Sequence, residues 1–370
     1  MQEIWVDREN YRNTKIVDVE PAPLGEGEIR VAVDKYGLTA NNVSYAVSGD
    51  MIGYWKYYPV SSDDGVNWGR VPVWGLTDVD ESECDGIVVG ERIYGFFPMA
   101  SHVVLKPGKI SDGSFADVAD HRRALPSLYN RYMRTEAEAD YLKTLENERC
   151  LLFPLFATGY GIADYLEDND FFGATQILIG SVSSKTGFSA AAFLKSETEF
   201  TGKVIGLTSP GNKDFVESLG CCDQVVIYGR EDEIDAGQKS VYMDMSGNGD
   251  IRSKLHHHIR DNMVRSIGVG VTHWEQGRKG GDMPGAKPEF FFYPAQIAKR
   301  DAEWGRGVLF QKAYAAGALL AKRTEDNLVV EFIRGPEAAR DIWVDMLDNN
   351  VSPKRGIMAS LNIDRDLKDG

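Results

Sequence analysis

The stretch QILIGSVSSKTGFSAAAFLK, residues 176–195, determines how the rest of the chain is organised. Its apolar run at 177–179 is typical of a buried parallel strand, and its alanine-rich part at 190–193 is typical of a helix packed closely on a sheet. Between them lies a turn of small residues from Gly180 to Gly187. The pattern predicts a strand, a tight turn and a helix N-terminus, whose N–H groups and dipole suit a pyrophosphate.

The turn departs from the usual glycine fingerprint, because serine, lysine and threonine stand where G-x-G-x-x-G would place glycines. Two interpretations stay open: a phosphate-binding turn, or a strand-to-helix turn with a Ser/Thr cap and no ligand. Under the first interpretation, we expect the phosphates of a cofactor to contact Gly180, Ser181, Ser183, Ser184, Lys185, Thr186 and Gly187.

The sequence after this stretch continues the alternation of strands and helices. Buried strands are predicted at 203–207, 224–227 and 241–245, with a short helix at 214–219. Strands that alternate with helices at this spacing indicate an α/β fold with a doubly wound parallel sheet.

The residues after the second predicted strand bear on the choice of dinucleotide. An acidic residue there would bind the ribose 2′-hydroxyl of NAD, but the chain carries Thr208, Ser209, Asn212 and Lys213. With a lysine nearby and no carboxylate to repel a phosphate, we favour NADP(H) as the cofactor; the alternative is a lysine that is merely solvated. Further candidates for cofactor contact are Tyr228, Asp244 and Ser246, with Asp244 alternatively capping the next helix.

The composition restricts the class of protein. At 370 residues the chain is long enough for roughly two domains. Its N-terminus is too polar for a signal peptide and no apolar run is long enough for a membrane span, so we expect a cytoplasmic protein. The net charge of −15 would repel nucleic acid and anionic lipid. We therefore expect a small-molecule substrate and no nucleic-acid or membrane partner, and a homodimer stays open.

The cysteines and histidines give no metal-binding pattern. Cys84, Cys150, Cys221 and Cys222 lack C-x-x-C spacing, so we expect reduced and mostly structural thiols. The histidine triplet at 256–258 falls on a predicted helix, where consecutive side chains point about 100° apart and cannot converge on one ion. We therefore predict no metal site and a partly exposed helix.

Short strands predominate before the central stretch. Residues 29–36 alternate as a half-buried antiparallel strand should, 86–94 resemble two strands with a turn, and 102–105 form another strand. Short strands separated by Gly and Pro suggest a β-barrel-like domain at 1–155. Residues 117–149 are charged and are interpreted as a helical insertion in it.

The remaining domain plan assigns 156–300 to the nucleotide-binding sheet and 301–370 to a long helix followed by a return to the first domain. In this part we expect strands at 264–271, 290–293 and 328–333, a basic glycine-rich loop at 276–287, and helices at 250–262, 301–322 and 336–347.

Five segments, taken in order, resemble the medium-chain dehydrogenase/reductase superfamily in its zinc-independent quinone oxidoreductase and enoyl reductase branch. They are VVGERIYGF (88–96), SHVVLKP (101–107), FPLFATGYGIADYL (153–166), CCDQVVIYGRED (221–232) and RGPEAARDIWVDML (334–347). The resemblance covers most of the chain. It implies a GroES-like β-barrel catalytic domain and a Rossmann-type nucleotide-binding domain.

The chain also departs from the alcohol dehydrogenases of that superfamily. Residues 36–42 and 75–77 lack the catalytic zinc ligands, and the structural four-cysteine lobe is missing. These departures and the altered turn indicate a divergent branch described only as a domain of unknown function. The resemblance implies an NADPH-dependent, zinc-independent oxidoreductase that reduces a conjugated carbonyl, enoyl or quinone-type molecule. The alternative is a nucleotide-binding lyase, isomerase or sensor with no net redox turnover.

The same resemblance suggests catalytic residues. Related zinc-free reductases often place a tyrosine where this chain has Tyr45, with Asn41 and Asn42 beside it. A phenol there can donate a hydrogen bond to a developing enolate; the alternative is a core aromatic beside two turn asparagines. Other aromatic residues either line a substrate pocket or fill a satellite core, and the candidates are Tyr54, Trp55, Tyr57, Tyr129 and Tyr132.

Overall fold

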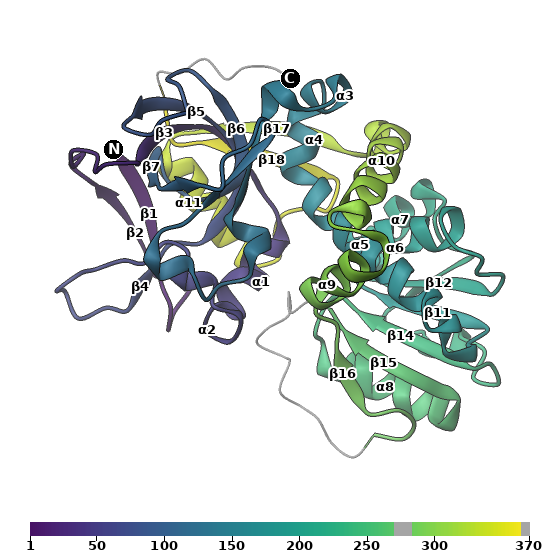
Figure 1. Cartoon of the computed structure of the whole chain (residues 1–370). Helices are drawn as coiled ribbons and strands as arrows, with labels where there is room; N and C mark the ends of the chain where they lie inside the picture. The colour runs from purple at the N-terminus through teal and green to yellow at the C-terminus, as the bar shows by residue number, and fades with distance from the viewer. Residues whose placement is uncertain (270–282, 364–370) are drawn as a thin grey trace. The chain divides into compact units, whose positions relative to one another are not determined.

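The computed structural model describes residues 1–269 and 283–363, which form two compact units (Figure 1). Unit 1 comprises residues 1–151 and the segment from 330 onward, and unit 2 comprises residues 152–329. The boundary therefore lies at 151/152, slightly before the expected one. The expected C-terminal segment is divided, because residues 301–329 belong to unit 2 and the segment from 330 onward belongs to unit 1.

Within the described residues, unit 2 contains a six-stranded parallel sheet. Its strands are β11 (Gln176–Gly180), β12 (Lys203–Thr208), β13 (Gln224–Ile227), β14 (Ser240–Asp244), β15 (Met263–Gly268) and β16 (Pro288–Phe290). They lie in the order β13-β12-β11-β14-β15-β16, which reverses direction between β11 and β14. This is the strand order of the doubly wound dinucleotide-binding fold, so the predicted parallel sheet is confirmed.

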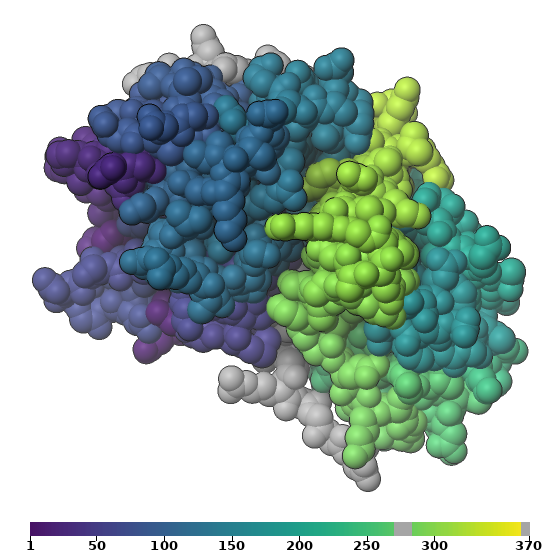
Figure 2. Space-filling view, viewed as in Figure 1, coloured from purple at the N-terminus to yellow at the C-terminus, as the bar shows by residue number. Residues whose placement is uncertain are grey.

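Helices cover the sheet of unit 2 (Figure 1). They are α5 (Phe153–Glu167), α6 (Lys185–Ser196), α7 (Lys213–Leu219), α8 (Gly249–Ile259), α9 (Tyr293–Trp304) and α10 (Val308–Arg323). Helix α8 packs Leu255 and Ile259 against Leu178 and Tyr242 of the sheet. Helices α5, α6, α9 and α10 pack on one another, and the outer surface of α10 is visible in Figure 2.

The expected long helix at 301–322 is instead the end of α9 followed by α10, because Gly305 and Gly307 have φ values of +100° and +83°, which interrupt a helix. Most of the expected glycine-rich loop, residues 276–282, lies outside the described residues, as does the end of the predicted strand at 264–271.

Unit 1 is built from antiparallel strands. In its described part, a three-stranded sheet contains β1 (Gln2–Asp7), β2 (Thr14–Asp18) and β4 (Trp68–Gly69). A nine-stranded sheet contains, in this order, β17 (Val329–Arg334), β18 (Arg355–Ser360), β3 (Ile29–Leu38), β5 (Pro72–Ser82), β6 (Arg92–Pro98), β10 (Arg131–Arg134), β9 (Ser114–Asp117) and β8 (Pro107–Gly108), with β7 (His102–Leu105) on β3. The helices here are α1 (Ala40–Val47), α2 (Gly49–Ile52), α3 (Asp140–Lys143), α4 (Glu146–Leu151) and α11 (Pro336–Leu347).

Strand β3 is buried along its whole length, so the prediction of a half-buried strand was wrong. Its polar residues are paired with opposite charges from other elements. Arg92 contacts Asp34 at 2.7 Å, Asp78 at 3.1 Å and Glu146 at 2.6 Å, and Lys35 contacts Glu146 at 2.9 Å. We call these five residues the buried ion cluster. It allows charged residues to remain in the interior.

The segment 117–149 also differs from the prediction, because it is an integral part of the barrel and not a helical insertion. Strand β10 lies between β6 and β9, and only short helical turns flank it. Tyr132 points inward and its ring stacks 5.3 Å from that of Phe115, whereas Arg131 is exposed. The alternation over four residues was too short to reveal a strand from sequence.

The predicted pair of strands at 86–94 is a turn region followed by β6, because Gly86 and Gly90 adopt φ values of +86° and +85°. No helix in residues 1–269 or 283–363 is both long enough and apolar enough to cross a membrane.

Candidate functional site

The turn between β11 and α6 lies where the strand order of unit 2 reverses. Ser184 caps the helix, because its Oγ accepts a hydrogen bond from the Gly187 N–H at 3.1 Å. The Val182 N–H donates to the Leu207 carbonyl oxygen at 3.0 Å and fastens the turn to β12. The capped N-terminus of this twelve-residue helix is therefore held at the carboxyl edge of the sheet, where ligands bind in such folds.

Two glycines allow the backbone of the turn to pack tightly. A Cβ atom at Gly180 would lie 2.5 Å from the Tyr242 hydroxyl, and one at Gly187 would lie 2.7 Å from the Ser181 carbonyl oxygen. Ser181 has a φ of +52°, a conformation that costs a non-glycine residue about 1–2 kcal/mol. Its N–H donates to the Tyr228 hydroxyl at 2.7 Å. Strain of this kind is concentrated at functional turns.

Lys185 begins α6 and is buried, with 9% of its surface exposed. Burial lowers the pKa of Lys185 to about 8. Because desolvation destabilises the charged form of the amine, an anion bound at this helix N-terminus would stabilise that form and raise the pKa again. The lysine and the helix dipole therefore favour the same kind of ligand.

The end of β12 carries the residues expected at the ribose. Thr208 is buried, and its Oγ1 has no hydrogen-bond partner within the part of the chain that the structure describes. The Asn212 amide donates to Ser183 Oγ at 3.3 Å, which links this end to the turn. Lys213 forms an exposed pair with Glu217 on its own helix, which raises the pKa of Lys213. Exposed pairs of this kind are weak, so Glu217 does not hold the lysine firmly.

Asp244 and Ser246 hold the turn after β14. Asp244 lies beside Gly180 in the sheet register. Its Oδ1 accepts hydrogen bonds from the Ser246 N–H at 3.0 Å, the Ser246 hydroxyl at 2.8 Å and the Gly247 N–H at 2.9 Å. Ser209 precedes the short helical turn Pro210–Asn212. The structure thus brings all the predicted cofactor residues, and Asn212 with them, to one edge of the sheet, and it adds Tyr242.

Unit 1 contains a second group of predicted residues. Buried rings form a tyrosine cluster made of Tyr45, Tyr54, Tyr57, Tyr58, Phe96 and Tyr129. The Tyr45 ring lies 4.6 Å from that of Tyr54, and the hydroxyls of Tyr54 and Tyr129 are 2.9 Å apart. Four of the predicted tyrosines are therefore neighbours, although they come from separate segments of the chain.

The Tyr45 hydroxyl accepts a hydrogen bond from Trp74 Nε1 at 3.1 Å. Burial, with Tyr129 beside it, raises the pKa of Tyr45, while bonds with Trp74 and Asn41 oppose the rise. The phenol therefore keeps its proton and can act as a donor. Asn42 is used structurally, because its Oδ1 accepts from the Thr39 N–H at 2.7 Å in a capping box that begins α1.

Tyr132 joins the cluster through a charged group that the sequence did not suggest. Its hydroxyl lies 2.9 Å from that of Tyr58 and accepts from Arg122 Nη1 at 2.9 Å. Arg122 is itself buried against Asp117 at 3.1 Å. Trp55 does not join the cluster, because it packs over glycines of other segments and stacks 6.5 Å from Tyr11.

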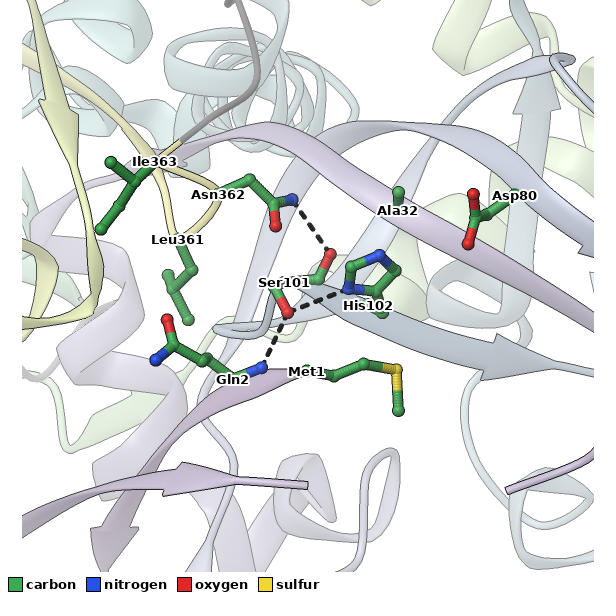
Figure 3. A pocket seen from close by; sticks show the side chains of 9 residues that line it. All are labelled: Met1, Gln2, Ala32, Asp80, Ser101, His102, Leu361, Asn362 and Ile363. Carbon is green, nitrogen blue, oxygen red and sulfur yellow. Dashed lines mark hydrogen bonds between the residues drawn. The ribbon is translucent and has the colours of Figure 1, made fainter. Parts of the chain in front are cut away.

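A cavity of about 550 Å³ opens elsewhere in unit 1 (Figure 3). The described residues that line it are Met1, Gln2, Ala32, Asp80, Ser101, His102, Leu361, Asn362 and Ile363. Ser101 Oγ accepts from the Gln2 N–H at 2.8 Å and lies 3.0 Å from His102 Nδ1. This lining includes none of the tyrosines predicted for a substrate pocket.

Among residues 1–269 and 283–363, no group of three or more His, Cys, Asp or Glu side chains could hold a metal ion. Within the histidine triplet on α8, His256 is buried, with Nε2 2.8 Å from Ser266 Oγ, whereas His257 is exposed. The side chains therefore point in different directions.

Comparison with known proteins gives one family and many similar folds. The model of the family described as "Protein of unknown function (DUF2855)" matches residues 36–352. No curated protein matches the chain in sequence. CurA from Vibrio vulnificus in complex with NADPH is similar with a TM-score of 0.62 at 12% identity, over 98% of this chain and 99% of that one.

Two further solved structures are similar over nearly the whole chain. Mycobacterial Rv1454c complexed with NADPH has a TM-score of 0.57 at 13% identity, over 97% of this chain and 99% of that one. The quinone oxidoreductase from Coxiella burnetii has a TM-score of 0.54 at 14% identity, over 98% of this chain and 99% of that one. At these identities the similarity concerns the fold. It confirms the predicted combination of a GroES-like barrel and a Rossmann-type sheet.

Proposed function

The chain belongs to the family described as "Protein of unknown function (DUF2855)", and we propose that it is an NADP(H)-dependent oxidoreductase that works without zinc. The turn at 180–187 is the observation that carries this proposal. There, a capped helix N-terminus, two tightly packed glycines and a buried lysine lie together. Proteins of similar fold, CurA and mycobacterial Rv1454c, bind NADPH in their solved structures.

Each part of the unit 2 site has a role under this proposal. NADPH supplies a hydride when it is bound. The N-terminus of α6 and Lys185 would hold the pyrophosphate. Thr208 and Ser209 would meet the ribose, and Lys213 would exchange Glu217 for the 2′-phosphate. No acidic residue lies between Thr208 and Lys213, so no carboxylate stands where it would bind a ribose 2′-hydroxyl.

We propose that the substrate is a conjugated carbonyl, enoyl or quinone-type molecule. A hydride added to such a molecule places negative charge on an oxygen, which a fixed hydrogen-bond donor stabilises. The Tyr45 phenol is suited to this role, because burial keeps it protonated and Trp74 donates to its oxygen. A protein of similar fold from Coxiella burnetii is a quinone oxidoreductase.

A second candidate is a lyase, isomerase or sensor that binds the nucleotide without net redox turnover. The altered turn motivates it, because serine, lysine and threonine stand where the usual fingerprint of dinucleotide-dependent enzymes has glycines. Under this alternative, bound NADPH would stay reduced in the presence of every acceptor tested.

Lys185→Met tests the proposed site, because it removes the charge but keeps a buried side chain of similar length. We expect the Kd for NADPH to rise about tenfold, which corresponds to about 1.4 kcal/mol. The wild-type affinity should fall as pH rises above about 8, where Lys185 loses its proton, and the variant should lack this pH dependence. Lys195→Met on the same helix is the matched control, since Lys195 pairs with Asp223.

The assay combines titration of NADPH fluorescence with NADPH oxidation in the presence of enones, enoyl thioesters and quinones. Saturable binding with turnover of one class supports the oxidoreductase, and binding without turnover supports the second candidate. If the wild type shows no saturable binding, the proposal is wrong. Elemental analysis that finds one zinc per chain would contradict the zinc-independent mechanism.

We also propose a cytoplasmic location and a small molecule as the binding partner. The net charge of −15 supports a small molecule as the partner, because negative charge disfavours the binding of nucleic acid. Light scattering of the purified protein would decide whether it is a homodimer.

A further inference from the structure

Cys221 and Cys222 form a close pair of thiols between α7 and β13. Their sulfur atoms are 3.8 Å apart. Cys221 is buried, with 5% of its surface exposed, and Cys222 is partly exposed. The pair is fixed at both ends, because Gly220 ends α7 with a φ of +62° and Asp223 exchanges hydrogen bonds with Val204 of β12. Two sulfurs held at this distance can react as one dithiol.

Charge near the pair favours the reactive form. The Cys222 S–H donates to Cys221 and lowers the pKa of Cys221, and the cations of Lys195 and Arg323 act in the same direction. The same hydrogen bond, together with burial, raises the pKa of Cys222, so the negative charge of the pair lies on Cys221. The thiolate is the nucleophile in exchange with disulfides. Cys222 is the more exposed residue of the two, so we assign the first contact with an external reagent to its sulfur.

The pair also contacts the part of β12 on which the candidate cofactor turn is built. Cys222 Sγ lies 2.7 Å from the position that a Cβ atom would take at Gly206. Val182 of the turn places its Cγ1 2.7 Å from the same position. The Val182 N–H is bonded to Leu207, the next residue of that strand. The sulfur and the apolar side chain of the turn therefore pack on one α-carbon.

We propose that Cys221 and Cys222 are a redox-active dithiol that exchanges with low-molecular-weight disulfides of the glutathione type, and that its oxidation weakens cofactor binding at the turn. The second half of this proposal rests on the proposed function.

The exchange takes place in two balanced steps. Cys221 first accepts the Cys222 proton across the 3.8 Å that separates the two sulfurs. The Cys222 thiolate then attacks one sulfur of glutathione disulfide, an S–S bond to Cys222 forms, and the glutathione thiolate that leaves takes that proton from Cys221. The Cys221 thiolate then attacks the Cys222 sulfur, and the second glutathione thiolate leaves. The protein dithiol loses two electrons and two protons, and both pass to the two glutathione thiols.

Closing this bond must disturb the backbone. The Cα atoms of adjacent residues are about 3.8 Å apart, which is less than the roughly 4.4–6.8 Å that disulfides usually span. The Cys221–Cys222 segment must therefore rotate and draw the Cys222 sulfur away from Gly206. Val182 loses its neighbour, and the turn loosens. Strain also makes the bond easier to reduce, so the change is reversible.

To test the proposal, the whole chain is treated with glutathione disulfide. Its intact mass, its peptide map and its Kd for NADPH are then measured. We expect the mass to fall by about 2 Da, a link within the peptide that contains residues 221–222, and recovery with dithiothreitol. The Kd for NADPH should rise about tenfold on oxidation. Cys222→Ser should bind NADPH like the reduced wild type and should not respond to glutathione disulfide. Cys84→Ser is the matched control and should respond fully, since Cys84 lies in unit 1.

Two results would overturn the proposal. If the mass does not fall in excess glutathione disulfide, the pair is not a redox-active dithiol. If the bond forms but the NADPH Kd changes by less than about twofold, the dithiol does not act on the turn. If neither the reduced nor the oxidised protein binds NADPH, the proposed function is wrong. The mass measurement still shows whether the two cysteines form a redox-active dithiol. Hydrogen exchange of residues 180–187 then decides the coupling, with faster exchange expected after oxidation.

Discussion

The candidate sites of the two units consist of different kinds of groups. In unit 2 the site consists mainly of backbone at one turn, and Gly180, Gly187 and the start of α6 shape it. In unit 1 the candidate residues are buried side chains, and their hydroxyls and charges are paired across strands far apart in sequence. A site made of backbone should tolerate most single substitutions, whereas a site made of paired buried groups should fail when one partner is removed.

The largest effect is expected where unit 1 buries charge. Glu146→Gln should leave Lys35 and Arg92 without their shared carboxylate, at a cost of about 3–5 kcal/mol in the free energy of unfolding. Urea unfolding of the full chain measures this loss. Glu136→Gln is the control, because Glu136 is exposed and its removal should cost about 0–1 kcal/mol. If both variants lost the same free energy of unfolding, the paired buried groups of unit 1 would not be especially sensitive to the loss of one partner.

The same residue predicts an acid dependence. Burial raises the pKa of Glu146, but hydrogen bonds and charge from Arg92 and Lys35 outweigh burial and lower it below the ordinary value of 4.5. Its contribution to stability is therefore fully present above that ordinary value and is lost as the pH falls through the lowered pKa of the folded state. Glu146→Gln should unfold without this acid-dependent step.

The next effect concerns the donor in the tyrosine cluster. Tyr45→Phe should lower kcat by about 10²-fold, or about 3 kcal/mol, and leave the NADPH Kd unchanged, since only the hydroxyl is removed. Tyr94→Phe is the control, because that buried hydroxyl donates to the Arg149 carbonyl oxygen and is not among the candidate residues. If Tyr45→Phe unfolds or loses cofactor, Tyr45 is structural. If turnover stays within about twofold, the donor must be sought among Asn41, Asn42, Tyr129 and Tyr132.

A smaller effect is expected at the exposed end of β12. Lys213→Glu should raise the Kd for NADPH by about tenfold and leave that for NADH nearly unchanged, because it places a negative charge where the 2′-phosphate would lie. Calorimetry with both nucleotides measures the preference. Lys203→Glu at the other end of the strand is the control. Equal affinities of the wild type for NADPH and NADH would show that the preference does not exist.

The smallest effect concerns the backbone of the turn. Ser181→Gly should raise the free energy of unfolding by about 0.5–1 kcal/mol, because glycine adopts a φ of +52° without strain. Ser183→Gly, in the same turn but without a positive φ, should lower it by a similar amount. Thermal unfolding of both variants checks the sign. A destabilised Ser181→Gly would mean that its side chain, and not only its backbone, holds the turn.

The site in unit 2 could be largely predicted from sequence because its pattern is local. The strand, the turn and the start of α6 lie within twenty consecutive residues, and apolar periodicity and small residues mark them. Tyr242 could not be predicted, since only the sheet register places its hydroxyl over Gly180. The Tyr228 contact with Ser181 depends on the pairing of β12 with β11 and β13.

The interior of unit 1 could not be predicted for the opposite reason. Asp34 and Lys35 suggested a solvated strand face, because their partners Arg92 and Glu146 lie far away in sequence. Tyr132 sits on a strand of four residues, too short to show a period. Arg122 resembled a helical surface residue, but Asp117 and Tyr132 satisfy its charge in the interior. A charged residue whose partner lies far away in sequence looks exposed when its own segment is considered alone, so its burial cannot be predicted from that segment.

The pairing of β18 with β3 has a consequence for biosynthesis. Met358 lies opposite Gly37, so unit 1 joins strands from near the two ends of the chain, whereas unit 2 is one continuous segment. A ribosome delivers all of unit 2 before it delivers β18. Unit 2 can therefore fold while residues 36–38 of β3, which β18 will pair, still expose an open edge, and such an edge invites pairing with other chains. Unit 1 is complete only when β18 pairs with β3, and these strands are far apart in sequence. We therefore expect this pairing to be the slow step of folding.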